Sequence, residues 1–343
     1  MTANPTTAPA ALLVDGYDAA LFDLDGVVYL GPIAVPHAAV GINALRRRGV
    51  RMGFVTNNAA RPPAAVAEHL VELGISCTDS DVVTSAQAAA RLLVDRFGSG
   101  AKVLMIGGAG VVEALQEAGL VGVRSADDNP AAVIQGWGKD LAWEHLNEAA
   151  IAIQRGAYWV ATNTDTTRPT DRGIVPGNGA AVTAVRTAVD VDPEVAGKPY
   201  RPLMEETVHR LGARHPIFVG DRLDTDIAGA VTVGMDSLFV LSGAHGAAEL
   251  LAAGDDCRPT HIGLHLGALL NPPREVSWLV NRVTCNTMAA VAAHGQIRLE
   301  RKPADAEEAV DALWAVTQLV WQARDRRCLI DPSPAVELLT ALP

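Results

Sequence analysis

Residues 20–31 read ALFDLDGVVYLG, an apolar run that ends in two aspartates and a glycine. Asp23 and Asp25 are one residue apart, and side chains at that spacing in a strand point to the same side. Two carboxylates this close repel each other unless a cation lies between them or they share a proton. Gly26 follows at once and lets the backbone approach a ligand closely. The stretch predicts a buried strand that ends in a site, although a strand-end aspartate capping a turn has the same sequence pattern.

Short apolar runs alternate with helix-like segments along most of the chain. Runs that are apolar throughout are typical of parallel strands covered by helices on both faces. Prolines near the start and glycines just past the end mark the expected helices at 36–49 and 62–74. The pattern predicts an α/β fold with enough strands for two successive α/β units. Expected strands are at 20–24, 50–57, 102–108, 131–137, 157–163, 216–221 and 236–241.

Two polar segments have side chains that can bind phosphate. Thr56, Asn57 and Asn58 end the run GFVTNN (53–58), where hydroxyl, amide and backbone N–H groups can hold phosphate oxygens. The same three residue types also form ordinary turns. Lys198 in EVAGKPY (194–200) supplies a flexible cation in a chain whose basic residues are mostly arginine. It suits a phosphate group or a set of neighbouring carboxylates.

Three acids follow the strand-like run PIFVG (216–220). Asp221, Asp224 and Asp226 can bind a hard divalent cation, although such residues commonly cap the start of a helix. In open parallel sheets the carboxyl ends of the strands form one ligand-binding edge. Because all the polar clusters follow strands, the sequence predicts that one sheet edge gathers them.

Composition excludes several classes of partner. The 343 residues are 49% hydrophobic with a formal net charge of −11, so the chain has a sizeable core and lacks the cationic excess that nucleic acids or anionic membranes attract. Residues 1–16 contain no basic residue, and no later run approaches the roughly 20 apolar residues of a membrane span. We therefore expect a cytoplasmic protein. Its four cysteines are far apart and are expected to be free thiols.

The sequence NPPRE (271–275) separates the α/β part from a tail. Within the tail, 276–284 and 295–300 are expected strands, and 303–326 is an expected helix with acids first, bases last and an apolar stripe. A segment of about seventy residues has difficulty holding a core of its own. We expect the tail to pack on the rest of the chain or on a second subunit.

Four stretches in order, DLDGVVYLG (23–31), VTNN (55–58), GKP (197–199) and GDRLDTDI (220–227), resemble the motifs of the haloacid-dehalogenase superfamily. The resemblance covers about residues 18–245 and is closest to the branch that includes nitrophenyl phosphatases and phosphoglycolate phosphatases. It implies a Rossmann-like core with a parallel sheet (12–83 and 191–267) and an inserted α/β cap of the C2 type (84–190). A small α+β extension (271–343) is left, which faintly resembles part of an acetyltransferase fold but lacks a glycine-rich loop for acetyl-CoA.

The resemblance also implies a chemistry, the hydrolysis of a small phosphate monoester. Asp23 would attack phosphorus and form an aspartyl-phosphate, and Asp25 would protonate the leaving group and then deprotonate water. Dehalogenases of the superfamily lack an acid at the second position and transport ATPases carry threonine there, so Asp25 favours a phosphatase.

The remaining motif residues would hold the metal and the phosphate. Mg²⁺ would bind Asp23, the Asp25 backbone carbonyl and Asp221, with Asp226 orienting these ligands. The phosphate oxygens would be held by residues of the first three motifs, namely Gly26, Thr56, Asn57, Asn58 and Lys198.

Inside the expected cap, ATNTDTTRPTDRGIVPGNGA (161–180) resembles the substrate loop of this branch. The resemblance implies that Asn163, Asp165 and Arg168 face the substrate, although Arg168 could equally be a solvated loop charge. The layout with an extra tail is similar to actinobacterial glycerol-3-phosphate phosphatases and favours glycerol 3-phosphate. Phosphoglycolate, pyridoxal phosphate and nucleoside monophosphates are the alternative substrates, and caps of this type often pair into homodimers.

Two other interpretations are weaker. VLMIGGAGVVEALQEAG (103–119) begins like a dinucleotide-binding loop, but Glu113 occupies the third glycine position, and a tight turn between a strand and a helix explains Gly108 and Gly110 better. A phosphometabolite sensor without turnover would not need Asp25 as a proton carrier.

Overall fold

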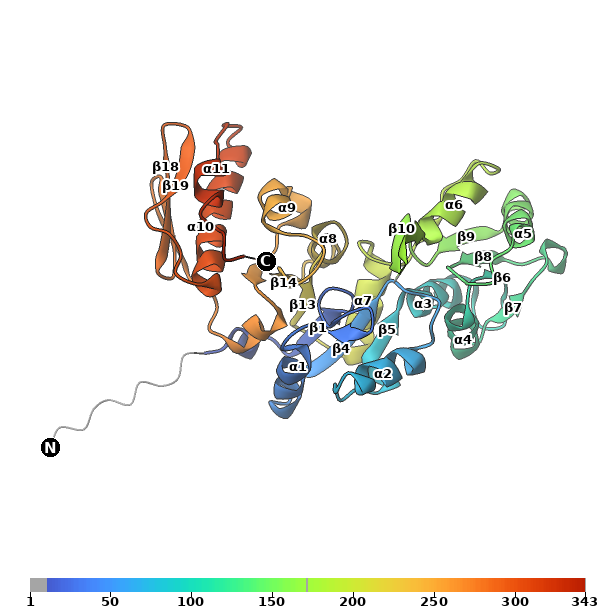
Figure 1. The fold of residues 1–343 in the computed structure, drawn as a ribbon. Helices are drawn as coiled ribbons and strands as arrows, with labels where there is room; N and C mark the ends of the chain where they lie inside the picture. The colour runs from blue at the N-terminus through green and yellow to red at the C-terminus, as the bar shows by residue number, and fades with distance from the viewer. Residues whose placement is uncertain (1–10, 171, 343) are drawn as a thin grey trace.

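The computed structural model describes residues 11–170 and 172–342 (Figure 1). Residues 1–10, which carry most of the expectation about the N-terminus, lie outside the described residues. The main sheet has six parallel strands in the order β15-β14-β13-β1-β4-β5. From β1, the chain first adds β4 and then β5 on one side, and later adds β13, β14 and β15 on the other side. The strand order therefore reverses direction at β1. The strands are β1 (Ala19–Asp23), β4 (Arg51–Thr56), β5 (Val82–Thr84), β13 (Pro216–Gly220), β14 (Asp236–Val240) and β15 (His261–Gly263).

Helices cover both faces of this sheet, as the apolar strands predict. Phe22 of β1 packs in one cluster with the first two helices, whereas Leu21 packs on the opposite face with helices that follow later in the chain. A short hairpin follows β1. These elements are α1 (Ala38–Arg47), α2 (Pro63–Glu72), α3 (Ser85–Phe97), α7 (Arg201–Leu211), α8 (Ala228–Thr232), α9 (Ala247–Ala252), β2 (Tyr29–Leu30) and β3 (Ile33–Ala34).

A second parallel sheet lies on the other side of α3 and α7 (Figure 1), in the order β12-β9-β8-β6-β7. We call this sheet with its helices and the β10–β11 hairpin the cap. Glu194 and Val195, which follow the expected cap segment 84–190, pair with β9 and extend this sheet by one short strand. The cap elements are β6 (Lys102–Ile106), α4 (Ala109–Glu117), β7 (Val121–Val123), β8 (Ala132–Gln135), α5 (Trp143–Gln154), β9 (Tyr158–Ala161), β10 (Thr167–Thr170), β11 (Gly173–Pro176), α6 (Asn178–Arg186) and β12 (Glu194–Val195).

The tail forms an antiparallel four-stranded sheet and a long helix. The interpretation of 276–284 as one strand was wrong, because the chain turns at Val280 and Asn281 and returns as a second strand. A further strand at 288–293 was not predicted, since its alanine-rich sequence gives little strand signal. The tail elements are β16 (Val276–Leu279), β17 (Arg282–Cys285), β18 (Met288–Ala293), β19 (Gln296–Leu299), α10 (Ala306–Asp325) and α11 (Ser333–Val336).

The tail packs on the rest of the chain, as expected from its size. Residues of α10 share one buried cluster with Phe239 of the main sheet and Leu250 of α9. The indole N–H of Trp321 donates a hydrogen bond to the Leu250 carbonyl oxygen at 3.2 Å. All four cysteines are free thiols. No helix in the described part of the chain is long and apolar enough to cross a membrane.

Candidate active site

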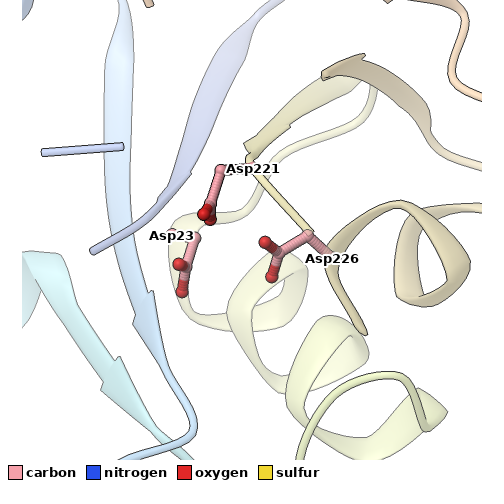
Figure 2. Close-up of side chains that lie close together, drawn as sticks. All are labelled: Asp23, Asp221 and Asp226. Carbon is pink, nitrogen blue, oxygen red and sulfur yellow. The ribbon is translucent and has the colours of Figure 1, made fainter. Parts of the chain in front are cut away.

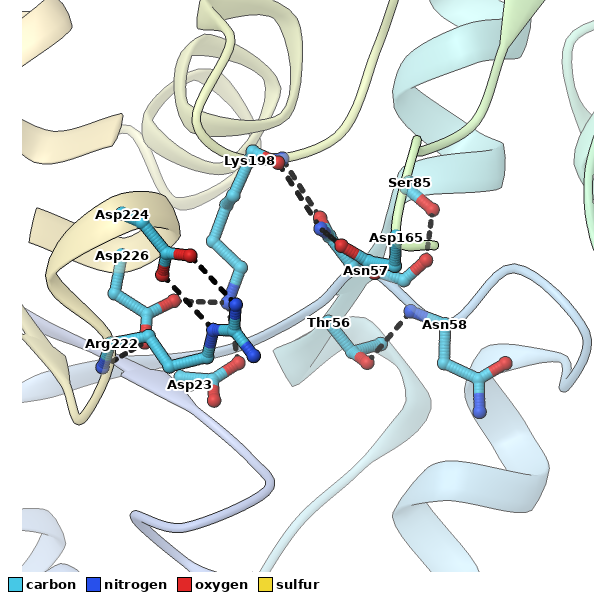
Figure 3. Close-up of polar contacts among 10 residues, drawn as sticks. All are labelled: Asp23, Thr56, Asn57, Asn58, Ser85, Asp165, Lys198, Arg222, Asp224 and Asp226. Carbon is cyan, nitrogen blue, oxygen red and sulfur yellow. Dashed lines mark hydrogen bonds and ion pairs between the residues drawn. The ribbon is translucent and has the colours of Figure 1, made fainter. Parts of the chain in front are cut away.

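Polar residues from several segments meet at the carboxyl edge of the main sheet, beside the switch in strand order (Figure 3). Asp23 ends β1, Thr56 ends β4 and Asp221 follows β13. Lys198 lies between β12 and α7 and reaches into the same region. This is the location at which open parallel sheets bind ligands.

Three carboxylates face one another at this edge (Figure 2). Asp23, Asp221 and Asp226 each offer an oxygen, and these oxygens lie within 4.8 Å of one another. Asp221 Oδ2 accepts a hydrogen bond from the Ala244 N–H at 2.6 Å, but its buried Oδ1 has no hydrogen-bond partner among the described residues. A buried oxygen without a donor, facing further carboxylates, fits a hard divalent cation such as Mg²⁺.

Two glycines make room for the Asp221 carboxylate. A Cβ atom on Gly26 would lie 2.3 Å from Asp221 Oδ2, and one on Gly243 would lie 2.0 Å from the same oxygen. Gly26 also has a φ of +89°, a conformation that residues with side chains rarely adopt. Gly26 therefore serves the close approach of Asp221, a role that the sequence did not indicate.

Lys198 holds two of the three acids together. Its ammonium group forms ion pairs with Asp23 and, at 2.7 Å, with Asp226 Oδ1, and the residue is only 4% exposed. Burial favours the neutral amine, but the two carboxylates outweigh this and raise the pKa of Lys198 above its usual value. Burial, followed by the charge of Asp226, raises the pKa of Asp23 well above its ordinary value and that of Asp221 to about 7. A divalent cation would relieve this excess of negative charge.

Asn57 connects the main sheet to Lys198 and to the cap. Its side chain accepts a hydrogen bond from the Lys198 N–H at 2.8 Å and donates one to the Lys198 carbonyl oxygen at 3.2 Å. Its backbone carbonyl accepts hydrogen bonds from Ser85 Oγ at 2.6 Å and from Asn163 Nδ2 at 2.7 Å. Asp165 of the expected substrate loop lies 3.3 Å from Asn57 Nδ2 (Figure 3). The cap loop thus reaches the edge where the acids gather.

Asp25 is close to this cluster but is not part of it. Its side chain reaches solvent, yet the protein atoms packed around it raise the pKa of its carboxyl group, against the opposing effect of Lys198. A raised pKa increases the protonated fraction of the carboxyl near neutral pH. The Gly26 carbonyl next to it accepts a hydrogen bond from Ser242 Oγ at 2.8 Å.

The remaining two members of the second motif form a turn. Thr56 Oγ1 accepts a hydrogen bond from the Asn58 N–H at 3.0 Å, and Asn58 Oδ1 accepts one from the Ala60 N–H at 2.9 Å. The Asn58 side chain points away from the Lys198–Asp23 pair (Figure 3). The structure thus does not bring the Asn58 side chain to the expected phosphate site, because its oxygen caps the following turn.

Arg168 lies on β10 of the cap, stacked on an aromatic ring. Its Cζ atom is 4.0 Å from the centroid of the Trp137 ring. Its Nε is buried and has no hydrogen-bond partner within the described ranges. Arg168 is thus half-buried, and its Nε is shielded from solvent.

Sequence reasoning missed two parts of the site. The loop 242–244 follows β14, and its Ser242 and Ala244 form hydrogen bonds with Gly26 and Asp221. Its position directly after an apolar strand-like run could have indicated that it lies at the ligand-binding edge of the sheet. Arg222 was also missed. Its guanidinium forms an ion pair with Asp224 at 2.8 Å. Asp224 is the one acid of the fourth motif that lies outside the carboxylate cluster, and this ion pair explains where its side chain goes.

Comparisons with known proteins agree with this geometry. The sequence model described as haloacid dehalogenase-like hydrolase matches residues 20–121, and a second, described as HAD-hydrolase-like, matches residues 195–269. The chain is 42% identical over 315 residues to the D-glycerol 3-phosphate phosphatase of Mycobacterium tuberculosis, covering 90% of this chain and 87% of the relative.

Solved structures give the same result. A crystal structure of the glycerol phosphate phosphatase from Mycobacterium tuberculosis in complex with magnesium is similar over 97% of this chain and 100% of its own, with a TM-score of 0.85 and 38% identity. A structure described as a putative p-nitrophenyl phosphatase from Bacillus subtilis matches with a TM-score of 0.66 and 33% identity, over 74% of this chain and 95% of its own. The first likeness takes in nearly the whole chain, whereas the second leaves about a quarter of it unmatched.

Proposed function

The chain belongs to the haloacid dehalogenase-like hydrolases and is a phosphatase, and on that premise we propose that it hydrolyses glycerol 3-phosphate with Mg²⁺ as cofactor. The observation that carries the proposal is the buried set of Asp23, Asp221 and Asp226 around the ammonium group of Lys198. The carboxylates suit a bound metal ion, and the ammonium group beside them suits a phosphate group. The identity to the Mycobacterium tuberculosis enzyme supports glycerol 3-phosphate as the substrate.

The metal would be held by one carboxylate oxygen each of Asp23 and Asp221 and by the Asp25 backbone carbonyl. Asp226, already paired with Lys198, would orient these ligands rather than bind directly. When bound, the ion neutralises charge on the phosphoryl oxygens and so makes phosphorus easier to attack. The unpartnered Oδ1 of Asp221 supports this assignment.

Asp23 is the proposed nucleophile. A carboxylate oxygen forms a bond to phosphorus while the bond from phosphorus to the glycerol oxygen breaks, which gives an aspartyl-phosphate. The glycerol alkoxide takes a proton from the Asp25 carboxyl group, whose raised pKa favours the protonated form needed for this step. Lys198 and the Thr56 hydroxyl would hold phosphoryl oxygens in place as the charge moves.

The second half of the reaction restores the enzyme. Asp25, now ionised, takes a proton from a water molecule whose oxygen attacks phosphorus, and the bond between Asp23 and phosphorus breaks. The products are inorganic phosphate and a free Asp23 carboxylate. Splitting one displacement into two in this way lets a single side chain serve as acid and then as base.

The cap residues would recognise the glycerol part of the substrate. Asp165 can accept hydrogen bonds from hydroxyl groups, and burial raises the pKa of its carboxyl group. Arg168 can donate hydrogen bonds to the same hydroxyls from its terminal nitrogens. Acceptor and donor on one loop suit a small polyol phosphate.

Phosphate release by the purified protein with Mg²⁺ tests the proposal, over a panel of glycerol 3-phosphate, phosphoglycolate, pyridoxal phosphate and nucleoside monophosphates. We expect the highest kcat/KM on glycerol 3-phosphate and loss of turnover in Asp23→Asn. If another compound of the panel gave the highest kcat/KM, the proposed substrate would be wrong and the proposed mechanism would stand. Binding of one of these compounds without turnover by the wild type would favour the sensor instead.

Three sequence-based expectations complete the proposal. The core is proposed at 12–83 and 191–267, with the cap inserted at 84–190 and the extension at 271–343. A homodimer formed through the cap rests on the family resemblance, and light scattering after size exclusion tests it. The cytoplasmic location rests on the sequence composition, and fractionation of cells that produce the protein tests it.

A further inference from the structure

We propose that Trp137 is a positioning residue, which fixes the Arg168 guanidinium for the non-phosphate part of the substrate. We further propose that the glycine loop Gly107–Gly110 holds Trp137 in register with the core. The inference rests on the proposed function, because it takes Arg168 as the residue that faces the glycerol. It assigns a role to a tryptophan and to a glycine-rich motif that the catalytic chemistry does not use.

The stack of Arg168 on Trp137 leaves the guanidinium available to a ligand. The Arg168 Cζ atom lies over the indole ring, 4.0 Å from its centroid. A guanidinium that stacks on an aromatic face can still direct its N–H groups outward to a ligand. Among the residues that the structure describes, no carboxylate forms an ion pair with Arg168. Within 11–170 and 172–342, the charge of Arg168 lies against an aromatic ring and pairs with no acid.

The backbone of Trp137 is fixed on both sides. The Gly136 N–H donates to the Ile106 carbonyl oxygen at 2.8 Å, and the Trp137 carbonyl oxygen accepts from the Gly108 N–H at 3.1 Å. A Cβ atom on Gly138 would lie 2.9 Å from the carbonyl carbon of Gly107. The glycine after Trp137 therefore allows the two loops to lie backbone against backbone.

The same glycine loop contacts the core behind the second motif. The Gly110 N–H donates to the Ala60 carbonyl oxygen at 3.2 Å, and a Cβ atom on Gly110 would lie 2.5 Å from the Ala59 carbonyl oxygen. Ala59 directly follows Asn58 in the sequence. Contacts thus run from the core turn through Gly110 and Gly108 to Trp137 and on to Arg168. The glycines that resemble a dinucleotide-binding loop serve close approach between backbones.

Fixing Arg168 in advance should affect binding more than chemistry. An arginine side chain has several rotatable bonds, and ordering them when the substrate binds costs free energy. If Trp137 orders them beforehand, its loss raises KM for a substrate that Arg168 contacts. The affinity for inorganic phosphate, which occupies only the phosphoryl site, should not change.

The test compares Trp137→Leu, Trp137→Phe, Arg168→Ala and the Trp137→Leu/Arg168→Ala double variant, by KM and kcat on glycerol 3-phosphate and by Ki for inorganic phosphate. For Trp137→Leu and for Arg168→Ala we expect KM to rise about tenfold, with kcat within about twofold and Ki unchanged. Trp137→Phe, which keeps an aromatic face, should stay within about threefold of the wild type. The double variant should be no worse than Arg168→Ala, because Trp137 acts through Arg168.

The chain offers a matched control for the arginine. The exposed Arg96 of α3 stacks on Tyr158 at the start of β9, with its Cζ atom 4.1 Å from the ring centroid. Arg96→Ala removes an equivalent stack away from the acid cluster and should leave KM unchanged. Should Trp137→Leu fail to fold, Trp137→Met replaces it, because its flexible unbranched side chain adapts to irregular space and has no aromatic face.

The outcomes separate the inference from the function on which it rests. If Arg168→Ala raises KM and the Trp137 variants do not, Trp137 has no positioning role and the proposed function stands. If Arg168→Ala leaves KM unchanged, the substrate-facing role of Arg168 in the proposed function is wrong, and the inference fails with it. Additive effects in the double variant, or a parallel rise of Ki for phosphate, would show that Trp137 acts on the fold and overturn the inference.

Discussion

The side-chain amide of Asn57 holds both backbone polar groups of Lys198, one as acceptor at 2.8 Å and one as donor at 3.2 Å (Figure 3). These residues belong to segments far apart in the sequence, and the pairing fixes where the Lys198 side chain begins. From that point the ammonium group reaches Asp23 and Asp226. Asn57 therefore affects the proposed phosphate site partly by positioning Lys198.

Asn57→Ala should lower both stability and activity. The change leaves the backbone N–H and carbonyl of Lys198 without partners, which we expect to cost about 1–3 kcal/mol in the free energy of unfolding. A displaced Lys198 should lower kcat by about tenfold to a hundredfold. Urea unfolding and steady-state kinetics on glycerol 3-phosphate measure the two effects.

Asn43 is the matched control for Asn57. Its amide makes the same kind of double contact on the surface, donating to the Gly74 carbonyl oxygen at 2.8 Å and accepting from the Ser76 N–H at 3.1 Å. Asn43→Ala should cost some stability and leave kcat unchanged. Equal losses of kcat in the two variants would mean that Asn57 has no specific effect on the site.

Lys198→Met should destabilise the protein when Mg²⁺ is absent. Removing one partner from a buried ion-paired set leaves Asp23 and Asp226 uncompensated, which typically costs about 3–5 kcal/mol. Turnover should fall by about a hundredfold to a thousandfold, because a cation that holds the phosphoryl oxygens is lost. Thermal melts in EDTA and single-substrate kinetics test both effects.

The Lys198→Met/Asp226→Asn double variant separates charge balance from catalysis. Removing the Asp226 charge as well should recover part of the lost stability, while turnover stays low. Recovery of activity together with stability would indicate that Lys198 serves only to balance charge.

Removal of the metal should have a pH-dependent effect on stability. Burial, and then the charge of Asp226, raises the pKa of Asp221 to about 7 in the folded protein, above its value in the unfolded chain. Between about pH 4 and pH 7 the metal-free folded state therefore binds more protons than the unfolded state, so this group makes the protein less stable as the pH rises. Mg²⁺ binds the ionised form of the Asp221 carboxylate, so bound Mg²⁺ should offset this loss of stability.

We expect Mg²⁺ to bind about tenfold more weakly at pH 6 than at pH 8, because protons compete for Asp221 at the lower pH. The increase in Tm on adding a fixed Mg²⁺ concentration should accordingly be larger at pH 8. Asp221→Asn should remove most of the increase at both values. A Tm increase that does not change with pH would refute proton competition at this site.

Gly110→Ala should disturb the contact between the cap and the core. The added methyl group would lie 2.5 Å from the Ala59 carbonyl oxygen and 2.6 Å from that of Arg61, and backbone atoms cannot rotate away. A displaced cap should lower kcat/KM by about tenfold or more, since small misplacements cost large factors in rate. Gly16→Ala, where nothing lies within 4 Å of the new Cβ atom, is the control for the general effect of adding a methyl group. Equal kcat/KM values in the two variants would contradict a docking role for Gly110.

The sequence predicted the parallel sheet and its helices well because strands buried on both faces leave long apolar runs. Phe22 and Leu21 both read as core residues, and they pack on opposite faces of the sheet. The tail strands were predicted less well. β18 is exposed at one end and rich in alanine, and its pairing with β17 depends on a register that no local pattern encodes.

The residues of the candidate active site also differ in how well the sequence predicted their positions. Asp23, Lys198 and Asp221 follow strands or lie in motifs, so their positions could be inferred from the sequence. The stack of Trp137 with Arg168 could not, because the two residues come from separate cap segments and an aromatic ring carries no motif. Asn58 matched a motif but turned out to cap the following turn, since a local hydrogen bond to the Ala60 N–H is available.

The tail supports the loop that holds Asp221. Arg324 of α10 donates hydrogen bonds to the carbonyl oxygens of Leu251 at 3.0 Å, Ala252 at 2.9 Å and Ala253 at 2.6 Å, at the C-terminal end of α9. Helix α9 directly follows the loop whose Ala244 N–H binds Asp221. The tail is therefore linked to the carboxylate cluster through one helix and one hydrogen bond.

Deleting residues 274–343 should lower solubility and weaken Mg²⁺ binding, because it exposes the apolar surface around Leu250 and frees α9. The milder Trp321→Ala change should cost about 3–5 kcal/mol, since Trp321 is 7% exposed and packs in that cluster. Trp278→Ala, at a position 43% exposed in the same tail, should cost much less and serves as the control. Urea unfolding and titration with Mg²⁺ measure these effects. A truncated protein that stays soluble, folded and equally active would mean that the tail supports neither the core nor the metal site, despite the contacts of Arg324.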